Sequence, residues 1–244
     1  MKNDDPIKSA NIRMLRFVAN KLGELCQDLV FLGGCTTGLL ITDEYSPDVR
    51  YTLDVDCIVD VISLNRYYLL EKQLRERGFN KLLTDEIICR WHCEDVILDV
   101  MPTDEKILGF GNIWYKEAIQ QSILYSLGSE LDIKIVTAPF FLATKLEAFK
   151  SRGKYDFYSS HDFEDLVSVM DGRIEILADI ENTTYELKHY LAQTFIEIHK
   201  SRAFHDALPS HFIHYGVLAN DRITLFLKKM KAVMDGFIPK TTTP

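Results

Sequence analysis

The sequence predicts a mixed α/β (α+β) fold, in which a mixed sheet with flanking helices is followed by a helical C-terminal domain. Strand-like and helical apolar patterns alternate over the first hundred residues, whereas helical patterns dominate the second half. The length of 244 residues allows one large domain or two small ones. We therefore expect an α/β domain over 1–105 and a mainly helical domain over 106–244.

Apolar spacing and turn residues define the elements expected in the first half. Leu29–Leu32 is a wholly apolar run that ends at Gly33-Gly34, which indicates a buried strand, a tight turn and a short helix. Apolar and acidic residues alternate over 51–61, as in a second strand, and Ser63 is a suitable helix N-cap. In order, we expect a helix over 8–27, strands over 29–32 and 51–61, a helix from Ser63 to Gly78, and strands over 79–83, 87–91 and 96–100.

The second half is expected to add one strand, over 132–137, and then only helices. Pro139 suits the first turn of a helix, and Ser160 is a suitable N-cap. The expected helices run from Thr137 to Ser151, from Ser160 to Gly172, and over 174–181, 184–203 and 221–235.

Three aspartates, Asp54, Asp56 and Asp99, lie in the expected strands. Asp54 and Asp56 are two residues apart on a strand, so their side chains share a face about 6.5–7 Å apart. Asp99, near the end of another strand, completes an oxygen-rich set of the kind that Mg²⁺ prefers. Such a set can hold two metal ions that activate a hydroxyl and stabilise a leaving pyrophosphate. The alternative is a solvated acidic face, but apolar neighbours make unpaired carboxylates costly there.

The Gly33-Gly34 turn precedes the acidic strand. Glycine has no Cβ to obstruct a phosphate, and the N–H groups of the following helix would face a triphosphate. The hydroxyls of Thr36 and Thr37 are further candidate ligands. A Gly-Gly pair alone usually marks only a turn, so its significance comes from its combination with the three aspartates.

A second charged group lies in the helical half. Lys145 falls in an apolar helical stretch, where an unpaired ammonium is costly, so it requires an anionic partner. That partner is either a nucleotide phosphate or one of Asp162 and Asp165, which share a helix face. Arg152 lies one or two turns from Lys145, and the group can instead form a salt-bridge network between helices.

The pattern over about residues 28–102 resembles the nucleotidyltransferase superfamily that includes DNA polymerase β. The resemblance rests on the Gly33-Gly34 turn, the Asp54-x-Asp56 strand and the third strand carboxylate, Asp99. Gly34 departs from the pattern, because many relatives carry Ser at that position. The departure leaves Thr36 and Thr37 as the nearby hydroxyls.

The second half resembles one branch of that superfamily, the AbiEii/AbiGii-type nucleotidyltransferase toxins. Lys145 with Arg152, and Asp162-x-x-Asp165, are similar to motifs of that family, as is Arg50-x-Thr52-x-Asp54 at the start of the acidic strand.

The resemblance implies an enzyme dependent on Mg²⁺ or Mn²⁺ that transfers a nucleoside monophosphate from a nucleoside triphosphate to an acceptor hydroxyl. Asp54, Asp56 and Asp99 would be catalytic metal ligands. The nucleotide site would comprise Gly33, Gly34, Thr36, Thr37, Lys145, Arg152, Asp162 and Asp165. A toxin would act on RNA, tRNA or protein and have an antitoxin partner. Two alternatives stay open: transfer to a small molecule such as an aminoglycoside, and a nucleotide-binding regulatory module without turnover.

Composition restricts the cellular context. The formal net charge of −8 argues against broad, charge-driven binding to nucleic acid, although it leaves room for a local basic groove, and it would suit a cationic acceptor. We expect a cytoplasmic protein, since we see no secretory signal and no apolar stretch of membrane-spanning length. The five cysteines are expected to be reduced and buried, because they are odd in number and mostly lie among apolar neighbours. Cys89, His92 and Cys93 could bind zinc, but they lack a fourth ligand at suitable spacing.

Overall fold

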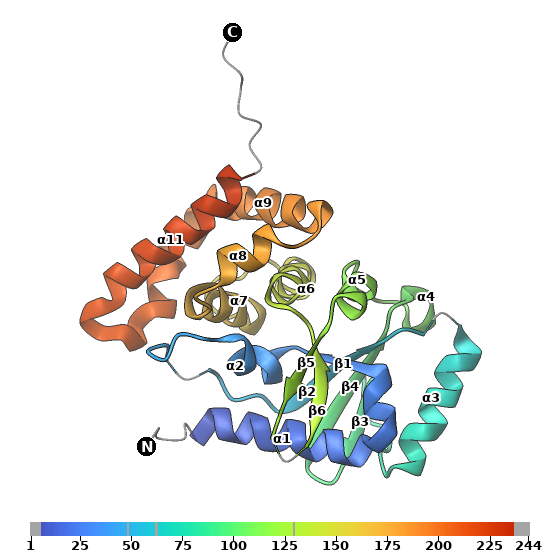
Figure 1. Ribbon diagram of the computed structural model, residues 1–244. Coiled ribbons are helices and arrows are strands. Elements are labelled where there is room, and N and C mark those ends of the chain that lie inside the picture. The colour runs from blue at the N-terminus through green and yellow to red at the C-terminus, as the bar shows by residue number, and fades with distance from the viewer. Residues whose placement is uncertain (1–5, 48, 62, 129, 237–244) are drawn as a thin grey trace. The chain divides into compact units, whose positions relative to one another are not determined.

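A computed structural model of the protein describes residues 6–47, 49–61, 63–128 and 130–236 (Figure 1). Residues 1–5, which carry part of the expectation about a secretory signal, lie outside this part. The chain forms two compact units. One comprises Met1–Leu39 and Asp48–Thr137, and the other comprises Leu40–Pro47 and Ala138–Pro244.

The first unit is built on a six-stranded mixed sheet with the strand order β3-β4-β2-β1-β6-β5. The neighbouring strands β2 and β4 run parallel, as do β1 and β6, and the other neighbouring pairs are antiparallel. The strands are β1 (Leu29–Leu32), β2 (Asp54–Val59), β3 (Arg90–Cys93), β4 (Val96–Pro102), β5 (Ile123–Ser126) and β6 (Asp132–Ile135).

Helices flank this sheet and cover its apolar residues. The Ser63 hydroxyl accepts a hydrogen bond from the Arg66 N–H at the start of α3, so this predicted N-cap is confirmed. Phe31 and Trp91 are fully buried in the core of the unit. The helical segments are α1 (Pro6–Leu22), the 3₁₀ helices η1 (Gly23–Asp28) and η2 (Gly34–Thr36), α2 (Thr37–Leu40), α3 (Leu64–Glu76), α4 (Glu105–Leu108) and α5 (Tyr115–Gln120).

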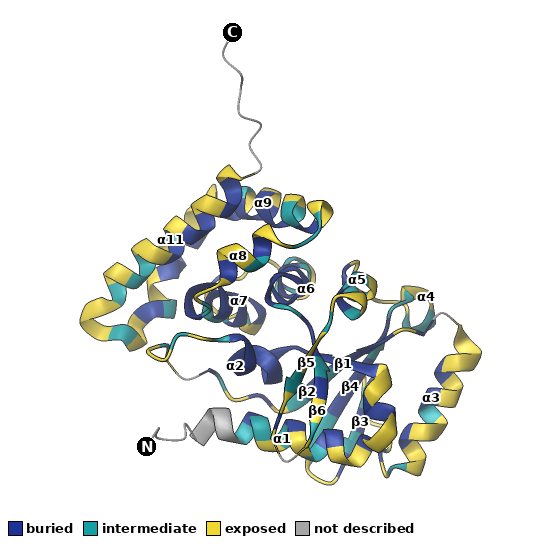
Figure 2. Cartoon of the chain, viewed as in Figure 1, coloured by how far each residue is buried: buried dark blue, intermediate teal, exposed yellow. Residues whose placement is uncertain are grey.

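The second unit is helical. Helix α6 (Ala138–Ser151) is buried along most of its length and packs against α7, α8 and α9 (Figure 2). Rings of Phe149, Phe157 and Phe163 meet in its core, each pair with centroids 5.0 Å apart. The other helical segments are α7 (His161–Gly172), α8 (Ile176–Glu181), α9 (Tyr185–His199), α10 (Arg202–Ala207), the 3₁₀ segment η3 (Leu208–Leu218) and α11 (Ala219–Asp235).

The short segment Leu40–Pro47 belongs to this helical unit although it lies far from it in sequence. The backbone N–H groups of Thr42 and Asp43 both donate to the carbonyl of Gly172, at 3.1 and 2.9 Å. The Asp43 carboxylate accepts a further hydrogen bond from Arg222 of α11 at 2.6 Å. Backbone and side-chain bonds together hold the segment against α7 and α11.

The predicted mixed α/β fold with a helical C-terminal region is confirmed. The boundary between the units falls at 137–138 rather than at 105–106, because β5 and β6 both join the sheet. In the part of the chain that the structure describes, no helix has the length and apolar character needed to cross a membrane.

Several element predictions need correction. The expected strand over 79–83 is reduced to a single bridge between Asn80 and His92, and the strand expected over 87–91 begins at Arg90. The first helix ends at Leu22, before Gly23 with its φ of 56°. The helix expected over 184–203 ends at His199, because Ser201 caps a new helix there.

Candidate functional site

The sheet brings the three predicted carboxylates onto one face. In the parallel pairing of β2 with β4, Asp56 lies directly opposite Asp99. Paired residues on neighbouring strands point to the same face, and Asp54 shares that face because it lies two residues before Asp56. Asp99 is the most enclosed of the three, with a residue exposure of 7%. Carboxylates from two separate stretches of the sequence thus form one acidic cluster.

The Gly33 backbone supports the Asp56 carboxylate. Gly33 has a φ of 77°, a conformation that side chains disfavour, and it directly follows Leu32, the antiparallel partner of Asp56. A Cβ placed on Gly33 would lie 1.9 Å from Asp56 Oδ2. Glycine is therefore required here both for the turn and for the position of the carboxylate.

Gly34 leaves room for a different side chain, Arg50. A Cβ on Gly34 would lie 2.4 Å from an Nη atom of Arg50 and 3.4 Å from Thr52 Oγ1. The Thr52 hydroxyl in turn donates to Asp54 Oδ1 at 2.9 Å. The guanidinium of Arg50 thus lies against the glycine turn, at the start of the acidic strand. Sequence reasoning noted Arg50 only as part of a motif and gave it no role.

The two threonines after the turn are enclosed. Thr36 and Thr37 have no exposed surface, and the Thr36 hydroxyl donates to the Gly33 carbonyl at 3.0 Å. The Thr36 hydroxyl therefore closes the turn from within. A contact between either threonine and a triphosphate stays a prediction.

Arg90 joins the acidic cluster and was missed by sequence reasoning. Its Nε and one Nη donate to the two oxygens of Asp99 at 2.9 and 2.7 Å, and the same Nη donates to Asp54 Oδ2 at 3.2 Å. The hydrogen bonding to Asp99 raises the pKa of the Arg90 guanidinium, although burial opposes this rise. A signal that could have found it is the short hairpin of β3 and β4, whose register sets Arg90 opposite Asp99.

The donor set of this cluster suits a hard divalent cation. Three carboxylates offer only oxygen ligands, the chemistry that Mg²⁺ and Mn²⁺ prefer, and the Arg90 guanidinium shows that a cation is accepted between Asp54 and Asp99. Among the described residues, no three acidic, histidine or cysteine side chains are grouped to hold a metal ion, and the Arg90 guanidinium lies between Asp54 and Asp99. The carboxylate oxygens are ligands of the type that binds such an ion, and the Arg90 guanidinium supplies a positive charge between two of the carboxylates.

The cysteines behave as predicted for reduced core residues. All five are buried and free of disulfides, and burial raises the pKa of Cys89 to about 12. His92 contacts Asp85, with 2.6 Å between Nε2 and Oδ2. The five thiols thus lie in the core, as expected from their apolar neighbours.

The second charged group forms inside the helical unit. Lys145 Nζ donates to Asp162 Oδ1 at 3.1 Å and to Asp165 Oδ2 at 2.6 Å, and Arg152 makes two bonds of 2.8 Å to Asp162. The side chains of Lys145 and Asp165 are only 7% and 1% exposed. The partners that sequence reasoning left open thus include both aspartates. A contact of Lys145 or Arg152 with a phosphate stays a prediction.

This network predicts a sensitivity to acid. Burial raises the pKa of Asp162, but the Arg152 hydrogen bond and the charges of Lys145 and Arg152 outweigh burial and lower it to about 2. Because the folded pKa lies below the unfolded value, Asp162 stabilises the fold above about pH 4, and this contribution is lost as the pH falls toward about 2.

We expect Asp162→Asn to remove about 2 kcal/mol of the change in the free energy of unfolding between neutral and acidic pH. Urea unfolding of both proteins at several values between about pH 5 and 2 measures the difference in slope. Equal losses of stability in the wild type and the variant would mean that Asp162 is not paired in solution.

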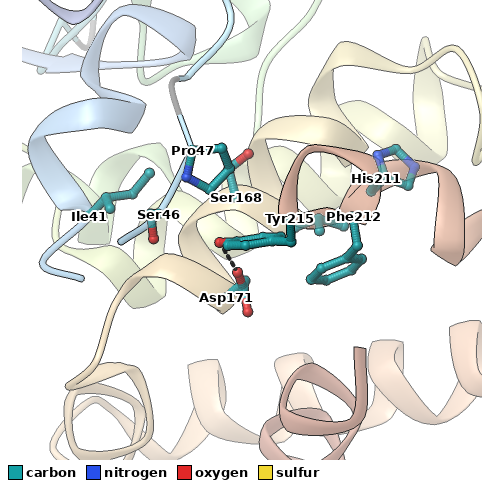
Figure 3. Close-up of a pocket in the computed structure, with 9 residues that line it drawn as sticks. Ile41, Ser46, Pro47, Ser168, Asp171, His211, Phe212 and Tyr215 are labelled. Atoms are coloured by element: carbon teal, nitrogen blue, oxygen red, sulfur yellow. Dashed lines mark hydrogen bonds between the residues drawn. The ribbon is translucent and has the colours of Figure 1, made fainter. Parts of the chain in front are cut away.

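The helical unit contains a cavity that none of the predicted site residues lines. The Tyr215 hydroxyl points to Asp171 and donates to its Oδ2 at 2.7 Å, with Ile41 and Ser46 on one side and Phe212 and His211 on the other (Figure 3). Arg222 donates to the same Asp171 oxygen at 2.6 Å. Among the described residues, Asp171 Oδ1 is enclosed and has no hydrogen-bond partner.

Comparison with known proteins does not identify the function of this protein. No protein-family model matches the chain, and no curated protein matches it. Among solved structures, the chain is similar to an antigenic nucleotidyltransferase-like protein from Paracoccidioides brasiliensis, with 20% identical residues and a TM-score of 0.46. That alignment covers 80% of this chain and 89% of the other. A similarity of this size does not assign a function.

Proposed function

We propose that the protein is a metal-dependent nucleotidyltransferase that moves a nucleoside monophosphate from a nucleoside triphosphate to an acceptor hydroxyl. The observation that carries this proposal is the grouping of Asp54, Asp56 and Asp99 on one sheet face next to the Gly33-Gly34 turn. A purely structural acidic face does not require a glycine with positive φ beneath one carboxylate. A metal-dependent phosphate-transfer site uses carboxylates to hold the ion, and glycine lets the backbone lie close to such groups.

Each group has a distinct task in this proposal. The three aspartates would hold Mg²⁺ or Mn²⁺, which when bound supplies positive charge for the leaving pyrophosphate and lowers the pKa of the attacking hydroxyl. Gly33 leaves room for the Asp56 carboxylate, and Gly34 leaves room for the Arg50 guanidinium beside the turn. Arg50, next to Gly34, offers a planar guanidinium that can bind a phosphate through two hydrogen bonds.

The acceptor proposed first is a hydroxyl of RNA, tRNA or protein, as for a toxin that an antitoxin holds in check. The motif resemblance of Lys145, Arg152, Asp162 and Asp165 supports this choice. The net charge of −8 favours a second candidate, a small cationic acceptor such as an aminoglycoside, because it opposes broad binding to a polyanion.

Labelled transfer tests the proposal directly. The purified protein is incubated with each α-labelled nucleoside triphosphate and Mg²⁺ or Mn²⁺, in the presence of total RNA, cell protein or a mixture of aminoglycosides. Label in one acceptor pool, absent with Asp56→Asn, is the expected result. A folded protein that neither transfers label nor binds any triphosphate would contradict the proposal.

The two glycines of the turn should respond differently to alanine. Gly33→Ala sets a Cβ against Asp56 and forces a strained φ, so we expect lost activity and a destabilisation of about 1 kcal/mol or more. Gly34→Ala displaces only the flexible end of Arg50, so the fold should persist while triphosphate affinity falls. Thermal unfolding and calorimetric titration with triphosphate separate the two effects. Unchanged affinity in folded Gly34→Ala would show that Arg50 and this turn are structural only.

A further inference from the structure

Arg90 occupies a central place in the acidic cluster. Strand β3 pairs antiparallel with β4 so that Arg90 lies opposite Asp99, which itself lies opposite Asp56 on β2. The three residues therefore form one row across the sheet, on the face that also carries Asp54. The fold itself, and not a chance rotamer, brings a guanidinium to the carboxylates.

The contacts of Arg90 coincide with those that a metal ion would make. One Nη lies 2.7 Å from Asp99 Oδ2 and 3.2 Å from Asp54 Oδ2, and thus between two of the three proposed ligands. The Nε takes the remaining Asp99 oxygen at 2.9 Å. A guanidinium and a divalent cation repel each other, and both require the same oxygens. The two cannot be held together in this arrangement.

We propose that Arg90 is the resident counter-cation of Asp54 and Asp99, which holds these carboxylates together without nucleotide and which a divalent ion must displace. This inference rests on the proposed function. It makes Arg90 a positioning residue that weakens binding of the ion alone. A metal-bound triphosphate brings its own negative charge, with which the displaced guanidinium can pair. The site would therefore bind metal and nucleotide together far better than metal alone.

The test measures Mn²⁺ binding to the full chain without nucleotide. The electron paramagnetic resonance signal of free Mn²⁺ reports how much of the ion stays unbound. Arg90→Gln should raise the Mn²⁺ affinity at least tenfold over wild type, because it removes the competing charge and leaves two adjacent carboxylates uncompensated. Arg90→Lys should raise the Mn²⁺ affinity less, since lysine keeps the positive charge but loses the bidentate hydrogen bonding to Asp99. Arg66→Gln, an exposed change on α3, should leave the affinity unchanged.

Thermal unfolding gives a second readout that needs no turnover. Without metal, Arg90→Gln should unfold at a lower temperature than wild type, because the enclosed Asp99 loses its partner. Added Mn²⁺ should raise the unfolding temperature of Arg90→Gln more than that of wild type, because at one Mn²⁺ concentration a tighter-binding ligand stabilises the folded state more.

The outcomes separate this inference from the proposed function. One result would overturn the role of Arg90 and leave the proposed function standing: wild type binds Mn²⁺ with triphosphate, but the Mn²⁺ affinity of Arg90→Gln is equal to or weaker than that of wild type. No Mn²⁺ binding by either protein, with or without triphosphate, overturns both. If Arg90→Gln does not fold, Arg90→Lys decides, and an affinity no higher than that of wild type overturns the inference.

Discussion

Asp56→Asn is expected to lower nucleotidyl transfer about a thousandfold or more while leaving the fold intact. Asparagine has the same shape, so it can still pack against Gly33, but it loses the negative charge that a divalent cation requires. Electrostatic stabilisation of the transferring phosphate accounts for most of the rate acceleration in such a reaction, and the bound metal ions are its main source. Asp54→Asn and Asp99→Asn should behave in the same way. The measurement is the initial rate of label transfer at saturating triphosphate.

A matched control distinguishes this effect from a general loss of charge. Asp95→Asn removes an exposed carboxylate from the turn between β3 and β4, outside the acidic cluster, and should leave the rate unchanged. Circular dichroism and thermal unfolding check that each variant is folded. Near-normal transfer by Asp56→Asn would rule out the metal assignment for this residue.

Lys145→Met is expected to be the most destabilising single change in the helical unit. It leaves Asp165, 1% exposed, and Asp162, 8% exposed, without the ammonium that both contact. Removal of one partner from a buried ion pair costs about 3–5 kcal/mol, because the remaining charge stays enclosed. Urea unfolding at neutral pH measures the loss. Lys150→Met is the control with a smaller expected effect, because Lys150 bonds to two hydroxyls and its ion-pair partner, Glu147, is partly exposed at 3.7 Å.

Two additional measurements on Lys145 define its role. The double change Lys145→Met with Asp165→Leu should recover part of the lost stability, because the enclosed carboxylate is gone. Triphosphate affinity of Lys145→Met, measured with Mg²⁺, addresses the phosphate contact, for which a charged hydrogen bond predicts a loss of about 1.5–3 kcal/mol. Normal affinity with a large loss of stability would remove Lys145 from the nucleotide site. A stability close to that of wild type would contradict the buried salt bridge.

Local sequence signals identified most elements that carry their own pattern. The apolar run of β1, the alternation in β2 and the caps Ser63 and Ser160 are each visible within a few neighbouring residues. Strand β5 was missed because its residues are mainly exposed, and antiparallel pairing with β6 holds it in place. The expected strand over 79–83 failed for the opposite reason, since apolar residues there find almost no partner strand.

The residues of the candidate site also differ in whether neighbouring sequence or tertiary structure determines their place. Asp54 and Asp56 were predicted to act together because spacing along one strand fixes which side chains share a face, and the turn was predicted because Gly33-Gly34 ends an apolar run. Arg90 could not be assigned a role, because its relation to Asp99 depends on the register between β3 and β4. Arg50 lies just before the acidic strand, but its packing against Gly34 depends on how the intervening chain folds. Strand register and tertiary packing, rather than composition, determine which cationic side chains lie beside the carboxylates.

The placement of Leu40–Pro47 in the helical unit limits how this protein can be divided or recombined. The chain crosses between the units three times, so the helical unit is not one continuous stretch of sequence. A truncation that starts at Ala138 would remove Asp43, the carboxylate that shares Arg222 with Asp171, and would leave the Gly172 carbonyl without its two backbone donors. Exchange of this unit between homologues would therefore need to transplant both segments together.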